Sequence, residues 1–156
     1  MEAHLELTFE PMWPNVRKIR QQVGAALEAC RQELRTAAMM TASELVENAI
    51  KYGENVTAAP TVTFSLEATS RQIVIRVING STNRAGVAEL ERRVKELATA
   101  TNKQALYQAR LEQLLAHADD SGKLGIYRIG FEGGFDLALD YQNDVVAMTA
   151  TRNSDV

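Results

Sequence analysis

The alternation of hydrophobic and polar positions predicts strands at both ends of the chain and in its middle. Near the start, apolar residues occupy every second position, which is the spacing of a strand with one buried face. The same alternation returns later in the chain. The predicted strands cover residues 5–9, 62–68, 73–78, 135–141 and 145–150. The stretch 73–78 is apolar on both faces apart from Arg76, so we expect it to be a central strand. Polar turns at 69–71 and 142–144 predict two hairpins.

Two amphipathic helices are predicted between the first and second strands. Apolar residues recur at helical spacing from residue 15 to about residue 34. Thr36 is the expected N-cap of a second helix that runs to Tyr52. Gly53 then follows, and we expect it to take the left-handed conformation that ends many helices.

A polar helical insert is predicted at residues 82–121, between the third and fourth strands. Thr101 and Gln104 have the spacing of a capping box for its second helix. Each helix has an apolar seam: Val87, Leu90, Val94 and Leu97 in the first, and Leu106, Ala109, Leu114 and Leu115 in the second. Glycines at 122 and 125 open a short helix that ends at the pair 133–134.

The order of these elements predicts the fold class. Because the strands arrive mainly as hairpins, the sheet should be mixed and mainly antiparallel, with the helices on one face. We therefore expect an α/β (α+β) two-layer sandwich in which residues 1–156 form a single domain.

Composition narrows the classes of protein that the chain can belong to. Its 17 basic and 20 acidic residues give a net charge of −3, which argues against a nucleic-acid partner. Cys30 is the only cysteine, so no internal disulfide can form. No apolar run approaches the length of a membrane span, and the first residues lack a signal peptide, so we expect a cytoplasmic protein without a membrane partner.

The predicted helix 36–52 carries the most informative polar residues. Glu44, Asn48 and Lys51 lie at i, i+4 and i+7 and therefore share one face. Such a face is most often only solvated, and Glu47 with Lys51 would then be an ordinary helix-stabilising pair. Alternatively, a carboxylate, an amide oxygen and an ammonium along one edge are the groups that a magnesium–phosphate site needs.

Two further segments contain glycines next to polar groups. The loop Gly122-Lys123-Leu124-Gly125 would let the backbone approach an anion closely, although a plain turn before a helix explains it equally well. Asn79-Gly80 ends the central strand and is a common turn pair.

Together and in this order, the three segments resemble the GHKL ATPase superfamily (gyrase, Hsp90, histidine kinase, MutL), whose nucleotide-binding fold is the Bergerat fold. Residues 42–53, ASELVENAIKYG, resemble its N-box, and residues 121–131, SGKLGIYRIGF, resemble its second glycine box. Within the superfamily the chain is most similar to the stand-alone serine-kinase branch of anti-sigma-factor kinases and SiaB-like regulatory kinases.

This resemblance implies a histidine-kinase-like ATPase domain that binds ATP and Mg²⁺ under a helical lid formed by the insert. Glu44 would be the general base, Asn48 would bind magnesium, and Lys51 would contact phosphate. The glycines at 122 and 125, with Lys123 and Leu124 between them, would cradle the phosphates. The implied activity is that of a protein serine/threonine kinase in a bacterial partner-switching system. Its partner would be a small regulatory protein, either an antagonist or sigma-factor-like, and the resemblance leaves a homodimer open.

The chain departs from the family pattern at its first glycine box. Where the family has an aspartate that accepts a hydrogen bond from adenine, this chain has Asn79, and Gly80 is the only glycine that follows. A neutral acceptor instead of a charged one costs about 1–2 kcal/mol. The alternative is therefore a binding module that kept the fold, lost the reaction and sequesters a partner protein.

Overall fold

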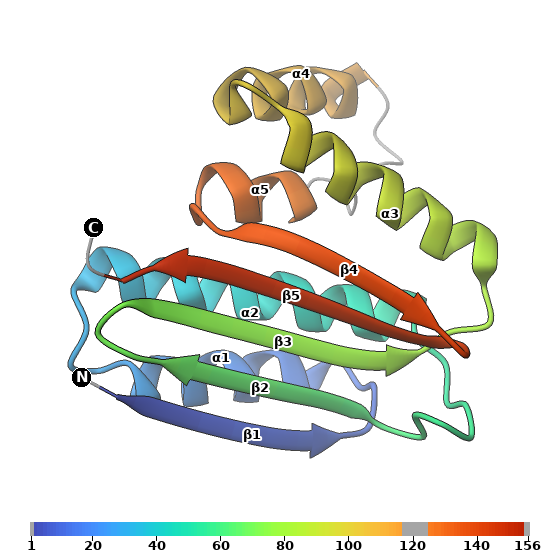
Figure 1. Cartoon of the computed structure of the whole chain (residues 1–156), viewed down its shortest axis with the longest axis horizontal. Helices are drawn as coiled ribbons and strands as arrows, with labels where there is room; N and C mark the ends of the chain where they lie inside the picture. The colour runs from blue at the N-terminus through green and yellow to red at the C-terminus, as the bar shows by residue number, and fades with distance from the viewer. Residues whose placement is uncertain (1, 117–124, 155–156) are drawn as a thin grey trace.

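The computed structural model describes residues 2–116 and 125–154 of the chain (Figure 1). Its elements, in order, are β1 (Ala3–Phe9), α1 (Pro14–Ala26), α2 (Gln32–Tyr52), β2 (Val62–Ala68), β3 (Gln72–Gly80), α3 (Arg84–Thr99), α4 (Lys103–Ala116), α5 (Gly125–Phe131), β4 (Asp136–Gln142) and β5 (Val145–Asn153). The strands form one antiparallel sheet in the order β1-β2-β3-β5-β4. The predicted two-layer sandwich and the central position of β3 are both confirmed.

The strand register separates an apolar face of the sheet from a polar one. Paired residues on the covered face are Leu7, Phe64, Val77, Met148 and Leu139. The row next to it, on the open face, is Glu6, Ser65, Arg76, Thr149 and Ala138. Because side chains alternate along a strand, a slip of one residue would expose the first row and bury the second. The β4–β5 turn closes at Asn143 and Asp144, whose φ angles of 53° and 62° suit a tight hairpin.

The boundary between the first two helices differs from the prediction. α1 ends at Ala26, and α2 begins at Gln32 and not after Thr36. Leu27 is fully buried in the turn between them, and its carbonyl accepts a hydrogen bond from the Cys30 N–H at 2.9 Å. Apolar residues continue at helical spacing through this turn, so periodicity alone does not detect the break. Thr36 lies inside α2, where its hydroxyl faces the Gln32 side chain at 3.4 Å.

Gly53 does not take the predicted left-handed conformation. Its φ of −83° and ψ of 155° are extended backbone that any residue can adopt. A glycine is needed here because the backbone of the preceding helical turn lies too close for a side chain: a Cβ at this position would lie 2.1 Å from the Ala49 carbonyl oxygen.

The insert contains two helices, as predicted, but only the first buries its apolar seam. Val87, Leu90, Val94 and Leu97 of α3 are all buried. On α4, Leu106 packs against the core and Leu114 is half-buried, but Ala109 is exposed and Leu115 is 81% exposed, so the second predicted seam is only half confirmed. The cap is also different, since Asn102 Oδ1 accepts a hydrogen bond from the Ala105 N–H at 3.0 Å and the box at Thr101 does not form.

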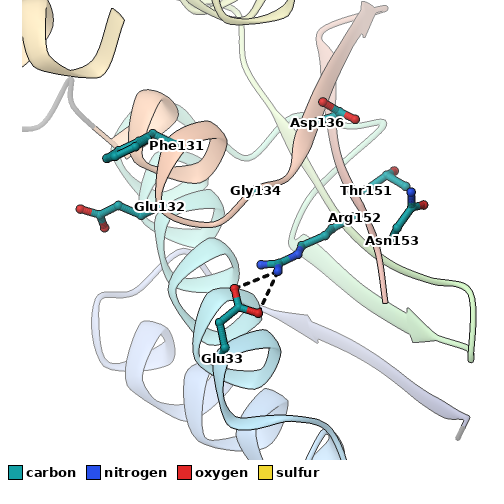
Figure 2. Close-up of a pocket in the computed structure, with 8 residues that line it drawn as sticks. All are labelled: Glu33, Phe131, Glu132, Gly134, Asp136, Thr151, Arg152 and Asn153. Atoms are coloured by element: carbon teal, nitrogen blue, oxygen red, sulfur yellow. Dashed lines mark hydrogen bonds and ion pairs between the residues drawn. The ribbon is translucent and has the colours of Figure 1, made fainter. Parts of the chain in front are cut away.

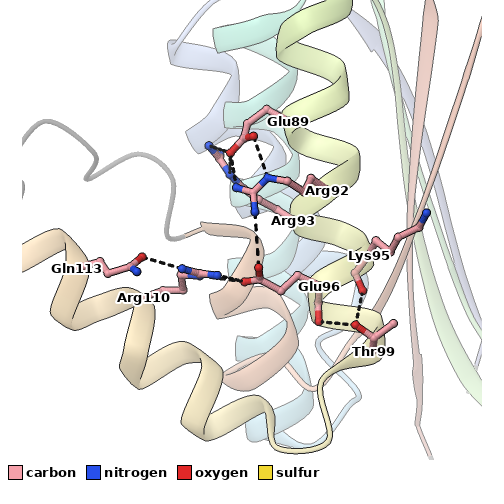
Figure 3. Close-up of polar contacts among 8 residues, drawn as sticks. All are labelled: Glu89, Arg92, Arg93, Lys95, Glu96, Thr99, Arg110 and Gln113. Carbon is pink, nitrogen blue, oxygen red and sulfur yellow. Dashed lines mark hydrogen bonds and ion pairs between the residues drawn. The ribbon is translucent and has the colours of Figure 1, made fainter.

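Polar side chains hold the two insert helices together (Figure 3). Arg110 of α4 contacts Glu96 of α3 through both Nε, at 2.9 Å, and Nη2. Arg93 is buried, and its guanidinium is paired with Glu89 on the same helix, with Nη2 3.1 Å from Oε1.

Within residues 2–116 and 125–154, none of the helices is both long and apolar enough to cross a membrane.

Candidate functional site

Glu44 lies on α2 against the first turn of α5. Its side chain is 16% exposed, and Arg128 Nη1 lies 3.1 Å from its Oε1. Gly125, the first residue of α5, is so close that a Cβ there would lie 2.1 Å from Glu44 Oε2. Of the predicted glycine loop, Gly122, Lys123 and Leu124 lie outside the described residues, while Gly125 lies beside Glu44.

The electrostatic surroundings of Glu44 favour its protonated form. Burial raises the pKa of Glu44 and is the largest effect, and the nearby charge of Glu47 raises it further. Arg128 lowers the pKa in the opposite direction without cancelling these effects. A carboxyl group with a raised pKa is better matched to accepting and releasing a proton near neutral pH than an exposed one.

Asn48 and Asn79 line one small cavity between α2, the sheet and α3. The cavity has a volume of about 20 Å³. Its remaining lining consists of Leu45, Ala49, Tyr52, Val77, Ser81, Gly86, Val87, Leu90, Val146 and Met148. The Asn48 Nδ2 group is buried and has no hydrogen-bond partner among the described residues, which is a costly arrangement for an amide. The Asn79 Nδ2 group donates to the carbonyl of Gly80 at 3.1 Å.

Lys51 and Gly80 have roles that the structure explains without a ligand. Lys51 is exposed, and its Nζ lies 5.3 Å from the centre of the neighbouring Tyr52 ring, outside the lining of the cavity. The Gly80 carbonyl accepts a hydrogen bond from the Glu54 N–H at 2.7 Å. A Cβ at Gly80 would lie 2.4 Å from Val56 Cγ2, so the glycine allows this loop to pack on β3.

Glu44 does not open into the cavity that Asn48 lines. It lies instead in a cleft of about 510 Å³ formed by α1, α2 and α5. The polar residues of the cleft are Arg20, Glu33, Thr36, Ser43, Glu44, Glu47, Arg128 and Glu132. The predicted site is therefore divided, with the carboxylate facing an open cleft and the two amides facing a smaller, more enclosed cavity.

Arg128 and Glu132 are site residues that the sequence hypothesis missed. Their i, i+4 spacing across the end of α5 predicts an ion pair, and the structure contains it, with Arg128 Nε 3.0 Å from Glu132 Oε2. The approach of Arg128 to Glu44, 84 positions away, has no local signal in the sequence.

A second open pocket, of about 470 Å³, lies where β5 ends beside the start of α2 (Figure 2). Arg152 binds both carboxylate oxygens of Glu33, at 2.8 and 2.9 Å, and donates from Nη1 to the Gly133 carbonyl at 2.8 Å. These contacts fasten the last strand to α2 and to the chain after α5, which is a structural role.

In the part of the chain that the structure describes, no three His, Cys, Asp or Glu side chains are grouped to hold a metal ion.

Comparison with known proteins adds no family to this picture. No protein-family model matches the chain, and no curated protein matches it. The resemblance therefore rests on the segments around Asn48, Asn79 and Gly125 and on their arrangement.

Proposed function

We propose that the chain is a cytoplasmic regulatory protein of the GHKL type that binds ATP with Mg²⁺ and phosphorylates a serine or threonine of a small regulatory protein. The unpartnered Nδ2 donor of Asn48 is the observation that carries the proposal, because it lacks a hydrogen-bond acceptor, such as a phosphate oxygen, in a cavity that Asn79 also lines. Glu44, one helical turn away beside Gly125, adds a carboxylate with a raised pKa.

The chemistry of these residues suits the ligand. Apolar walls with a few polar groups are typical of small-molecule sites, and the Asn79 amide can pair with the hydrogen-bonding edge of a base. The amide oxygen of Asn48 is of a type that Mg²⁺ accepts. ATP with its metal would supply the transferable phosphate. Glu44 would orient the hydroxyl of the protein substrate and take its proton, and the open cleft gives that hydroxyl a way to reach it.

The size of the cavity sets a condition on this function. About 20 Å³ holds no more than a water-sized molecule, whereas ligand sites usually measure about 300–1,000 Å³. Gly86, Val87 and Leu90 of α3 form the wall that belongs to the insert. We therefore propose that α3 moves outward when the nucleotide enters.

A second candidate is a binding module of the same fold that sequesters a partner protein without catalysis. Two features of the structure favour it: the small volume of the cavity and the ion pair that Glu44 already makes with Arg128. Asn79 in place of the family's aspartate favours it as well.

Isothermal titration calorimetry with Mg·ATP separates the two candidates. We expect the unmodified protein to bind with a Kd in the micromolar to near-millimolar range, roughly, since one charged contact is replaced by a neutral one. Asn48→Ala should remove the magnesium dependence of binding, whereas Gln108→Ala, at an exposed amide on α4, should leave it unchanged. Glu44→Ala should still bind Mg·ATP.

Phosphate transfer provides the second part of the test. Labelled γ-phosphate should pass from ATP to a small regulator encoded beside this protein, and Glu44→Ala should abolish the transfer. If millimolar Mg·ATP produces no heat of binding and no thermal shift, the kinase is rejected and the binding module remains.

A further inference from the structure

Among the described residues, Arg128 is the cation in contact with Glu44, and its position depends on a second carboxylate. Its Nη1 lies 3.1 Å from Glu44 Oε1, while its Nε donates to Glu132 Oε2 at 3.0 Å. Glu132 is held in turn by Tyr107 of α4, whose hydroxyl donates to Oε1 at 3.1 Å. The Tyr107 ring packs on Phe131, with ring centres 5.0 Å apart. The guanidinium is therefore fixed along one edge and presents Nη1 toward Glu44.

Two other cations of the described residues, Lys51 and Arg20, are placed less well to meet a phosphate beside Glu44. Lys51 lies seven positions further along α2, with its Nζ over the Tyr52 ring. Arg20 lines the same cleft as Glu44, but its Nη1 contacts the Ser43 hydroxyl at 3.3 Å. A guanidinium also suits the oxygens of a phosphate better than an ammonium does, because its planar N–H groups can bind two oxygens at once.

We propose that Arg128, rather than Lys51, contacts the terminal phosphate of the bound nucleotide. This inference rests on the proposed function and corrects the role that the family resemblance gave to Lys51. In the structure the Glu44 carboxylate lies 3.1 Å from Nη1, where the phosphate anion would bind. The γ-phosphate and Glu44 then compete for the same donor.

The competition has a consequence for Glu44. The positive charge of Arg128 lowers the pKa of Glu44, so a phosphate that takes over the guanidinium leaves Glu44 a stronger base. Arrival of the phosphate thereby releases the carboxylate that is to accept the hydroxyl proton.

Calorimetric titration of ATP and ADP, each with magnesium, tests the assignment through binding and not through turnover. Arg128→Met should weaken ATP binding about ten- to a hundredfold, the range for one charge-assisted contact, and ADP binding less than about threefold. Arg20→Met removes the same charge from the same cleft, and Lys51→Met removes the competing candidate. Each should change the ratio of ATP to ADP affinity by less than about threefold. Glu44→Gln should tighten ATP binding when Arg128 is present but not in the Arg128→Met background.

Each outcome supports or overturns the assignment. Arg128 is 37% exposed, so the variants should fold. If Arg128→Met does not fold, Arg128→Lys replaces it in the test, and we expect it to lose ATP affinity to an intermediate degree. An unchanged ATP-to-ADP ratio in both Arg128 variants, or an equal change in Arg20→Met, would overturn the inference while the proposed function stands. If the unmodified protein binds neither nucleotide, the proposed function fails and the inference fails with it.

Discussion

Gly130 of α5 packs directly against Leu97 of α3, so this contact joins the insert to the helix that carries Arg128. A Cβ at Gly130 would lie 2.5, 2.8 and 3.0 Å from Cδ1, Cδ2 and Cγ of Leu97. Leu97 is only 2% exposed, so its side chain has little room to move away. We therefore expect Gly130→Ala to destabilise the protein although alanine is the better helix former.

The size of the effect follows from two opposing contributions. Overpacking of a filled core costs about 1–3 kcal/mol, and the three close atoms place Gly130→Ala near the upper limit. Alanine instead of glycine in a helix returns up to about 1 kcal/mol. The net loss should be about 2 kcal/mol, which corresponds to a decrease in Tm of about 4–8 °C for a chain of this length.

A double-mutant cycle distinguishes this mechanism from a general loss of stability. Leu97→Ala alone should cost about 2–5 kcal/mol, because it leaves a cavity. In that background Gly130→Ala should instead stabilise by up to about 1 kcal/mol, so the coupling energy between the two positions is about 3 kcal/mol. Urea denaturation at neutral pH measures all four free energies of unfolding.

A leucine on the same helix provides the control. Leu90 of α3 is also buried but is not among the atoms nearest to Gly130. In a Leu90→Ala background, Gly130→Ala should cost the same 2 kcal/mol, roughly, as in the unmodified protein. If Gly130→Ala costs about as much with Leu97→Ala as without it, the steric reasoning is refuted.

Two further predictions concern pH. Because burial raises the pKa of Glu44, the free energy of unfolding should fall as pH rises through that pKa. In thermal unfolding, Glu44→Gln should therefore raise Tm over that of the unmodified protein more at pH 7 than at pH 4. Glu112→Gln, at an exposed site, should show no such difference between the two pH values. The hydrogen bond from Arg92 lowers the pKa of Glu89 to about 2, so its contribution to stability is present above the ordinary glutamate range and is lost as pH falls toward 2. Glu89→Ala, which leaves buried Arg93 without this carboxylate, should cost about 1–2 kcal/mol at pH 7 and much less at pH 2, as acid-unfolding curves would show.

Local patterns were enough to predict most of the fold. The alternation in 62–68 predicted a strand with one buried face, because a strand places every second side chain on the same side of the sheet, and the apolar stretch 73–78 predicted a central strand. The seam of α3 was predicted for a similar reason, since residues three and four apart share one face of a helix. The structure confirmed both because in these segments the local pattern and the burial agree.

Other local predictions were wrong because tertiary packing decided them. Apolar residues around Leu27 continue the helical spacing through a turn that the core fixes in place. Leu115 has the spacing of a buried residue, yet it is exposed because nothing in the described chain covers that side of α4. Periodicity states which residues share a face, and only the neighbouring elements decide whether that face is covered.

The sequence by itself determined that one helix face would carry Glu44 and Asn48, because helical spacing is a property of the backbone. Only the tertiary structure decided that Glu44 opens into a cleft and pairs with Arg128, while Asn48 closes a cavity beneath α3. The reason is that contacts between residues far apart in the chain depend on how helices and sheet pack around the core. No spacing along the chain encodes that arrangement.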